Sequence, residues 1–169
     1  MSIRIMGLDP GSIHTGFGVI QVEGSRVAAL AMGRLSSPRT MPLPERLARL
    51  AVETRDLLER WQPGLVAIET PFRGLNSRSL IVLAEARGAL LATVCLAGAE
   101  IREFSPAEVK KAIAGGGRAD KEQVARMARL LLRLGDDPLS HDSTDALAVA
   151  LCCAHRLRMD NLRRPHSPA

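Results

Sequence analysis

Short apolar runs at the start of the chain predict β-strands. Residues 3–8 are mostly apolar, and residues 15–22 and 27–35 follow them after short polar turns. Three strands so close together predict an antiparallel meander. Residues 65–68 are wholly apolar, as in a strand buried on both faces, and residues 100–104 predict a fifth strand.

Helical periodicity separates these runs. In residues 42–61 apolar side chains recur every three or four positions with arginine and glutamate between them, and Pro63-Gly64 ends the helix. Further helices are predicted at residues 77–97, from residue 105 onward, at 121–134 and from near residue 142 to about 158. This order of elements predicts an α/β fold with a mixed five-stranded central sheet and helices on both faces.

The length of 169 residues suits one domain, which we expect to span residues 1–158, followed by a polar, disordered tail at 159–169. Arginine, glutamate or glycine interrupts the apolar runs, so neither a membrane helix nor a signal peptide is expected. Cys95, Cys152 and Cys153 have no spacing typical of disulfides or zinc sites, which makes a cytoplasmic location the expectation.

The formal net charge of +5 permits a polyanionic partner without demanding one. The only lysines, Lys110, Lys111 and Lys121, all fall within residues 105–135, where seven basic residues accompany three acidic ones. Solvated helix faces and a nucleic-acid-binding surface both account for such a segment. Charge alone therefore leaves the partner open.

Two acidic residues follow predicted strands. Asp9 comes directly after the first strand and before Pro10-Gly11, and Glu69 ends the buried fourth strand. Each is also compatible with an ordinary turn or strand end that reaches water. Because adjacent strand ends converge at one edge of an open sheet, the two carboxylates are expected to lie close together.

Asp142 and Asp145 lie three residues apart at the start of the last helix, so they share one face of it. Acids in a first helical turn can serve only the free N–H groups and the helix dipole. Residues 146–153 are almost entirely apolar, however, so this helix is expected to be buried, and residues 138–154 contain no lysine or arginine. The two acids therefore need a cation from elsewhere.

Four carboxylates gathered at one place form an all-oxygen set of the kind that binds Mg²⁺ or Mn²⁺. Two such ions can activate a water and stabilise the leaving oxygen of a phosphodiester. The four histidines are scattered along the chain, and His141 is compatible with either a proton acceptor or a surface or capping residue. The residues themselves thus favour metal-assisted hydrolysis.

Five blocks, in order and at family spacing, resemble the RuvC family of Holliday junction resolvases over most of the chain. The blocks are Gly7-Leu8-Asp9-Pro10-Gly11-Ser12 with Thr15-Gly16-Phe17-Gly18-Val19-Ile20, Val66-Ala67-Ile68-Glu69 with Phe72 and Asn76, Ala86-Arg87-Gly88, Val109-Lys110 with Gly117 and Lys121, and Asp142 with Asp145-Ala146-Leu147-Ala148. One departure is Glu85, where many relatives carry an amide. Another is Asp142, where some relatives carry histidine.

The resemblance implies a ribonuclease H-like fold in which Asp9, Glu69, Asp142 and Asp145 are catalytic and bind two Mg²⁺ ions per subunit, with Mn²⁺ as an alternative. It implies a homodimer that resolves four-way DNA junctions by paired nicks in homologous recombination and DNA repair. A branch-migration helicase complex, RuvA and RuvB, is the implied partner.

The resemblance also implies roles outside the four acids. Lys121 would be a further catalytic residue that stabilises charge. Phe72 would stack on a base at the junction, the alternative being a side chain folded back onto the core. DNA contacts are predicted for Phe72, Arg73, Asn76, Lys110, Lys111, Arg118 and Lys121.

Three other functions share parts of this pattern. Ribonuclease H-like RNA-processing nucleases have the same Asp-x-Gly opening, but the basic segment at 105–135 and the Phe72 loop argue against them. Phosphate-binding modules of the actin and sugar-kinase type share Asp9-x-Gly11-Ser12 but need two such domains around a nucleotide. A junction-binding protein without catalysis is the third alternative, against which the four acids argue.

Overall fold

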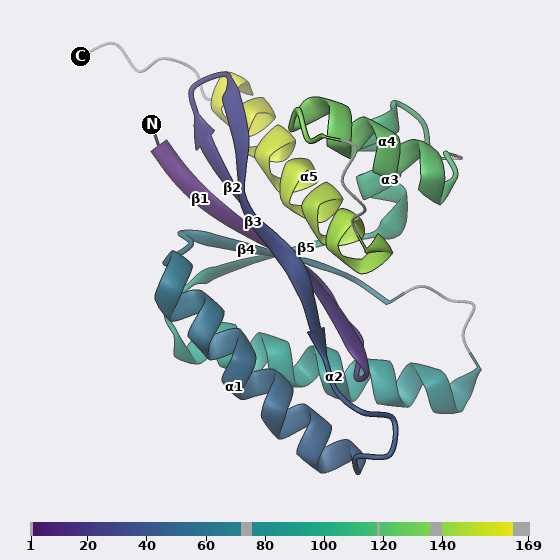
Figure 1. Ribbon diagram of the computed structural model, residues 1–169. Helices are drawn as coiled ribbons and strands as arrows, with labels where there is room; N and C mark the ends of the chain where they lie inside the picture. The colour runs from purple at the N-terminus through teal and green to yellow at the C-terminus, as the bar shows by residue number, and fades with distance from the viewer. Residues whose placement is uncertain (1, 72–75, 118, 136–139, 164–169) are drawn as a thin grey trace.

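A five-stranded mixed sheet forms the centre of the computed structural model, which describes residues 2–71, 76–117, 119–135 and 140–163 (Figure 1). Its strands are β1 (Ser2–Asp9), β2 (His14–Glu23), β3 (Arg26–Ser36), β4 (Leu65–Glu69) and β5 (Glu100–Phe104). Their order across the sheet is β3-β2-β1-β4-β5. β1 pairs antiparallel with β2, and β2 with β3, whereas β4 runs parallel to both β1 and β5. The predicted meander and mixed sheet are confirmed.

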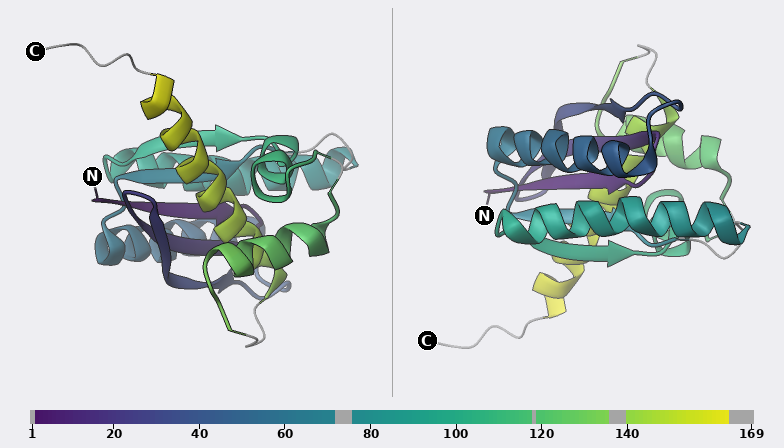
Figure 2. Two further views of the ribbon diagram at one scale, coloured as in Figure 1. Left: turned by 90° about the horizontal axis from the view of Figure 1, so that it is seen from above. Right: turned by 90° about the horizontal axis from the view of Figure 1, so that it is seen from below.

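Helices cover both faces of this sheet (Figures 1 and 2). One face carries α1 (Leu43–Trp61) and α2 (Ser77–Leu96), and the other carries α3 (Pro106–Ala114), α4 (Lys121–Leu131) and α5 (His141–Arg163). Side chains along β1 alternate between the two faces of the sheet. Ile5 packs into the core beneath α5, whereas Met6 and Leu8 pack beneath α1 and α2. The predicted α/β architecture is therefore confirmed.

Two helix ends differ from the prediction. α4 ends at Leu131 rather than at residue 134, because Leu132 caps it and Arg133 adopts a positive φ of 51°. α5 continues to Arg163, beyond the predicted end near Arg158. Arg156 and Asp160 form an i,i+4 ion pair of 3.6 Å that favours this extension. Residues 159–163 are thus helical, while residues 164–169 lie outside the described residues.

α2 is more apolar than expected from the charged residues within it. By length and composition it could span a membrane, since its most apolar window has a mean hydropathy of 1.8 and only 17% of that window is buried. Glu85 and Arg87 do not lower the hydropathy enough to change this result. Ala86, Leu90 and Val94 form the buried stripe against the sheet and α1. Three large apolar side chains of α2, Leu80, Ile81 and Leu96, are exposed to solvent.

Candidate active site

Two of the predicted acids end neighbouring strands. Asp9 is the last residue of β1 and Glu69 the last residue of β4. These strands are parallel neighbours in which Leu8 pairs with Ile68, so the two carboxylates project from adjacent positions at the same edge of the sheet. The convergence expected from the sequence is therefore seen in the structure.

Close packing of α5 on the sheet brings the other two acids to this edge. A Cβ atom at Gly7 would overlap the backbone oxygen of Ala146, and one at Gly16 would overlap that of Asp142. Only glycine leaves room for the helix backbone at these points. The N-terminus of α5 is thereby held against the ends of β1 and β2, and it carries Asp142 and Asp145 with it.

Capping of α5 does not depend on these acids. The N–H of Ser143 donates to Ser140 Oγ at 3.2 Å, and the Thr144 hydroxyl donates to the Ser140 carbonyl oxygen at 3.1 Å. The helix begins at His141, which is exposed, in agreement with the predicted start near Asp142. Since Ser140 supplies the cap, the carboxylates of Asp142 and Asp145 remain available for other contacts.

Three of the four acids line one hollow of about 250 Å³. Asp9, Glu69 and Asp145 meet there with Lys110 of α3 and Lys121 of α4. The remaining wall is mostly apolar and consists of Pro106, Val109, Val124 and Ala148. Asp142 lies one helical turn before Asp145 and is not part of this lining.

Each acid of α5 faces a basic side chain. Lys121 Nζ lies 3.5 Å from Asp145 Oδ2, and Arg34 Nη1 lies 3.5 Å from Asp142 Oδ2. Residues 138–154 contain no lysine or arginine, so both cations come from outside that stretch, and they are side chains of the protein itself. β3 and α4 bring Arg34 and Lys121 from distant parts of the chain, and no local pattern had marked Arg34.

Burial and mutual repulsion raise the carboxylate pKa values. The pKa of Asp9 rises from 3.8 to about 7, first because of burial and then because of the charges of Asp145 and Glu69, with Lys121 opposing the rise. Burial and Asp145 also raise the pKa of Glu69. Asp145 raises the pKa of Lys121 in turn. At Asp9, burial and the neighbouring acids thus outweigh the opposing effect of Lys121.

This donor set suits a hard divalent cation. Its donors are carboxylate oxygens, and burial together with the charges of Asp145 and Glu69 raises the pKa of Asp9, an effect that a bound cation would oppose. Within the described ranges, no three His, Cys, Asp or Glu side chains are already arranged to hold an ion. The pairing of Asp142 and Asp145 with Arg34 and Lys121 is consistent with that result.

The predicted DNA contacts have different surroundings. Asn76 is exposed at the start of α2, where its Oδ1 accepts the N–H of Ser79 at 2.9 Å. Lys111 is exposed on α3 and is not part of the hollow that Lys110 lines. Glu85, one of the two departures from the family pattern, is exposed on α2. Three predicted contacts lie outside the described residues: Phe72, Arg73 and Arg118.

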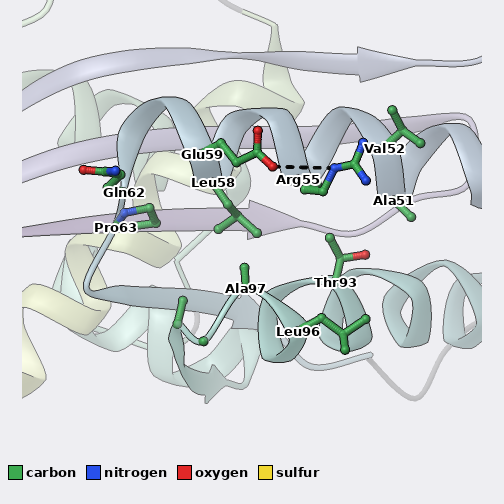
Figure 3. A pocket seen from close by; sticks show the side chains of 12 residues that line it. Ala51, Val52, Arg55, Leu58, Glu59, Gln62, Pro63, Thr93, Leu96 and Ala97 are labelled. Atoms are coloured by element: carbon green, nitrogen blue, oxygen red, sulfur yellow. Dashed lines mark ion pairs between the residues drawn. The ribbon is translucent and has the colours of Figure 1, made fainter.

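A larger hollow of about 680 Å³ lies elsewhere, between the C-terminal halves of α1 and α2 (Figure 3). Alanine, valine, leucine and proline side chains form much of its wall. Arg55 and Glu59, two of its charged residues, form an ion pair of 3.7 Å. α1 leads into the start of β4, whereas Asp9 and Glu69 lie at the ends of the parallel strands β1 and β4. This hollow is therefore not part of the carboxylate site.

Comparison with known proteins places the chain in a family. A family model described as crossover junction endodeoxyribonuclease RuvC matches residues 5–153. The protein of that name from Maricaulis maris is 41% identical over 162 residues, which cover 96% of this chain and 96% of the relative. Its counterpart from Heliobacterium modesticaldum is 39% identical over 153 residues, covering 90% and 94%.

Solved structures agree with this assignment. Thermus thermophilus RuvC in complex with Holliday junction substrate matches with a TM-score of 0.88 and 34% identity, over 94% of this chain and 96% of that one. The yeast mitochondrial Holliday junction resolvase, at a TM-score of 0.73 and 13% identity, shares the fold. The chain belongs to the RuvC family of crossover junction endodeoxyribonucleases.

Proposed function

We propose that this chain is a structure-specific endonuclease that resolves four-way DNA junctions by paired nicks in strands of like polarity, in homologous recombination and DNA repair. The observation that carries the proposal is the hollow in which Asp9, Glu69 and Asp145 meet beside Lys121. Partly buried carboxylates beside lysines suit metal-assisted phosphodiester hydrolysis. The names of the relatives identify the four-way junction as the DNA substrate.

Asp9, Glu69 and Asp145 would hold divalent metal, with Asp142 joining them after leaving Arg34. Mg²⁺ is the proposed ion, two per subunit, and Mn²⁺ is the alternative because both prefer oxygen ligands. When bound, such ions activate a water and stabilise the leaving oxygen of a phosphodiester. The raised pKa of Asp9 supports the proposal, because a cation there would replace the proton that this carboxyl otherwise retains near pH 7.

The lysines of the hollow act on the DNA phosphate. The Lys121 side chain is 83% exposed, so its ammonium group can contact a phosphate while remaining near Asp145. Lys110 approaches from α3, on another side of the same hollow. Val109 and Val124, both buried, form part of the apolar wall of this hollow. Charge interactions are stronger in such a partly dry site than at an open surface.

Pairing of nicks requires two copies of the site, and we propose that α2 forms the dimer interface. Ile81 is 60% exposed and Leu80 is exposed on the same helix. An apolar helix face of this kind is typical of a protein–protein interface. A partnership with the branch-migration helicase complex RuvA and RuvB is proposed from family membership alone.

The decisive experiment offers the purified protein three substrates with Mg²⁺: a synthetic four-way junction, a linear duplex of the same sequence, and a structured RNA. Symmetrically paired nicks in the junction alone are expected, and chelation of the metal should abolish them. Equal cutting of the linear duplex, or preferential cutting of RNA, would contradict the proposed substrate.

A further inference from the structure

A second hollow, of about 460 Å³, lies close to the carboxylate site on the side of α1 and α2. Its wall is formed by the loop that follows β1 and by the starts of the two helices. The charged side chains in it are Arg46 of α1 and Arg78 of α2, with His14 beside them. The other lining residues are Gly11, Ser12, Ile13, Ser79, Val82 and Leu83, so no acidic residue is among them.

Neither arginine is neutralised by another group in the described part of the chain. Arg49, one turn after Arg46 on α1, pairs with Glu53 at 2.7 Å. Arg46 has no such partner, and its Nε is buried without a hydrogen bond. Arg78 has no ion pair or side-chain hydrogen bond among the described residues either. Two guanidinium groups in one acid-free hollow therefore leave positive charge unbalanced.

The positions of these arginines within their helices increase the imbalance. Arg46 is the fourth residue of α1 and Arg78 the second of α2, so both lie in a first turn. The positive end of the helix dipole disfavours cations there and favours anions. The first turn of α2 contains no acid, and Glu45 in that of α1 does not line the hollow. The positive charge of the two arginines at these helix starts is therefore better stabilised by a bound anion than by the protein alone.

The loop between the two hollows is held in place. The Thr15 hydroxyl donates to the Gly11 carbonyl oxygen at 2.6 Å, and Thr15 is buried. Gly11 is two residues from Asp9, a path of at most about 7 Å of chain. Phosphates follow one another at about 3.4 Å of rise along each strand of duplex DNA. Because Gly11 lines the same hollow as Arg46 and Arg78, a strand with one phosphate at Asp9 could place another, a few nucleotides away, in this hollow.

We propose that this hollow binds a backbone phosphate of the same DNA strand whose scissile phosphate occupies the carboxylate site. Arg46 and Arg78 would be positioning residues, since guanidinium groups bind phosphate oxygens through paired N–H donors. They would set the direction in which the strand leaves the active site across the loop after β1. The inference rests on the proposed function, because it requires that the chain binds DNA.

The test compares Arg46→Gln/Arg78→Gln with Arg55→Gln/Arg60→Gln, a control that removes the same charge from the far end of α1. Binding of a labelled four-way junction is measured by anisotropy in EDTA at several salt concentrations. The first variant should raise Kd about 10-fold and reduce the slope of log K against log salt by about 1 to 2. The control should remain within about 2-fold of the unaltered protein, as expected of a surface away from the DNA.

Two further measurements separate positioning from catalysis and from folding. Single-turnover cleavage at saturating junction should remain within about 3-fold of the unaltered protein, because these arginines do not touch the reacting carboxylates. Arg46→Lys/Arg78→Lys, which retains the charge, should recover most of the affinity. Thermal unfolding of each variant checks the fold, and a lysine variant that binds no better than the glutamine variant would overturn the charge argument.

The outcomes distinguish this inference from the proposed function. Equal Kd values and salt slopes for the glutamine variant and its control would overturn the inference while junction cleavage stands. In another outcome, inorganic phosphate stabilises the unaltered protein and not the glutamine variant, while both bind the junction equally well. That result would assign the hollow to a small phosphate and would also overturn the inference. Junction binding that depends on both arginines, without any cleavage, would support the inference and refute the nuclease. A protein that binds no DNA refutes both.

Discussion

Asp9 is the residue whose ionisation couples the active site to the stability of the fold. Its pKa rises from 3.8 to about 7 on folding, so between these values the folded protein binds a proton that the unfolded chain has lost. Stability from this group is therefore complete below about pH 3.8 and is lost as pH rises towards 7. A shift of this size corresponds to about 4 kcal/mol at most, since bound metal or water offsets part of it.

Replacement Asp9→Asn should therefore stabilise the metal-free protein at high pH. We expect the free energy of unfolding in EDTA to increase by about 1–3 kcal/mol at pH 8 and to change little at about pH 3.5, because the amide carries no charge to repel Asp145 and Glu69. Urea unfolding at both pH values measures this difference. The exposed Asp56→Asn serves as the control, and a variant no more stable than that control at pH 8 would disprove the coupling.

Asp145 offers a test of the chemistry apart from DNA binding. The Asp145→Asn variant should lose cleavage by about 10³-fold or more, since a neutral amide is a poor ligand for a divalent cation. Junction binding in EDTA should remain within about 3-fold, because the lysines of the hollow are unchanged. Glu122→Gln, an exposed neighbour of Lys121 that does not line the hollow, is the matched control. Undiminished cleavage by Asp145→Asn would remove this residue from the proposed site.

Among the elements, α5 contributes most to the geometry of the active site. It packs across β1 and β2 and carries two acids to the ends of these strands. Its approach depends on glycines in the strands, because any larger residue would meet the helix backbone. The distance between helix and sheet therefore sets the distance between the acids of α5 and those of β1 and β4.

Gly16→Ala tests this dependence directly. The added methyl would overlap the Asp142 backbone oxygen and displace the start of α5, at a cost of about 1–3 kcal/mol of unfolding free energy. Cleavage should fall more than 10-fold, because the carboxylates of α5 move with the backbone. Gly116→Ala, where the methyl meets nothing within 4 Å, should leave stability unchanged or slightly increased. Chemical denaturation and junction cleavage of the two variants decide whether close packing governs the site.

On the scale of the whole molecule, the exposed face of α2 is the surface through which the proposed dimer would connect two active sites. The apolar side chains there bury little surface within one copy of the chain. A symmetric dimer through this face would cover them and present two carboxylate sites on one junction. Paired nicking would then depend on association, whereas single nicking would not.

Ile81→Glu should separate these two properties. A buried carboxylate without a partner destabilises an interface. The dissociation constant of the dimer should therefore increase by about 100-fold or more while the monomer remains folded. Sedimentation measures the association state, and a supercoiled cruciform plasmid distinguishes paired from single nicks. Leu130→Glu, on an exposed position of α4, is the control that should leave both unchanged. Intact dimers of the Ile81 variant would exclude this face as the interface.

Much of the fold and half of the site could be predicted because their causes are local. Alternation and helical periodicity act over a few residues, and they predicted the strands and most helix starts. Asp9 and Glu69 could be placed together because parallel strands end at one edge of a sheet. The predicted helix ends were less accurate. The positive φ of Arg133 follows the end of α4, and the Arg156–Asp160 ion pair favours the extension of α5. Each affects only one turn, and the periodic pattern of apolar residues does not describe it.

By itself the sequence determined the type of each element, the acidic residues at the strand ends, and membership of a family through ordered motifs. Only the tertiary structure decided which cations face the acids of α5, because Arg34 and Lys121 come from β3 and α4. It also decided that Arg46 and Arg78 share one hollow. The reason is physical: burial and repulsion depend on distances through space, and these follow from packing rather than from order along the chain.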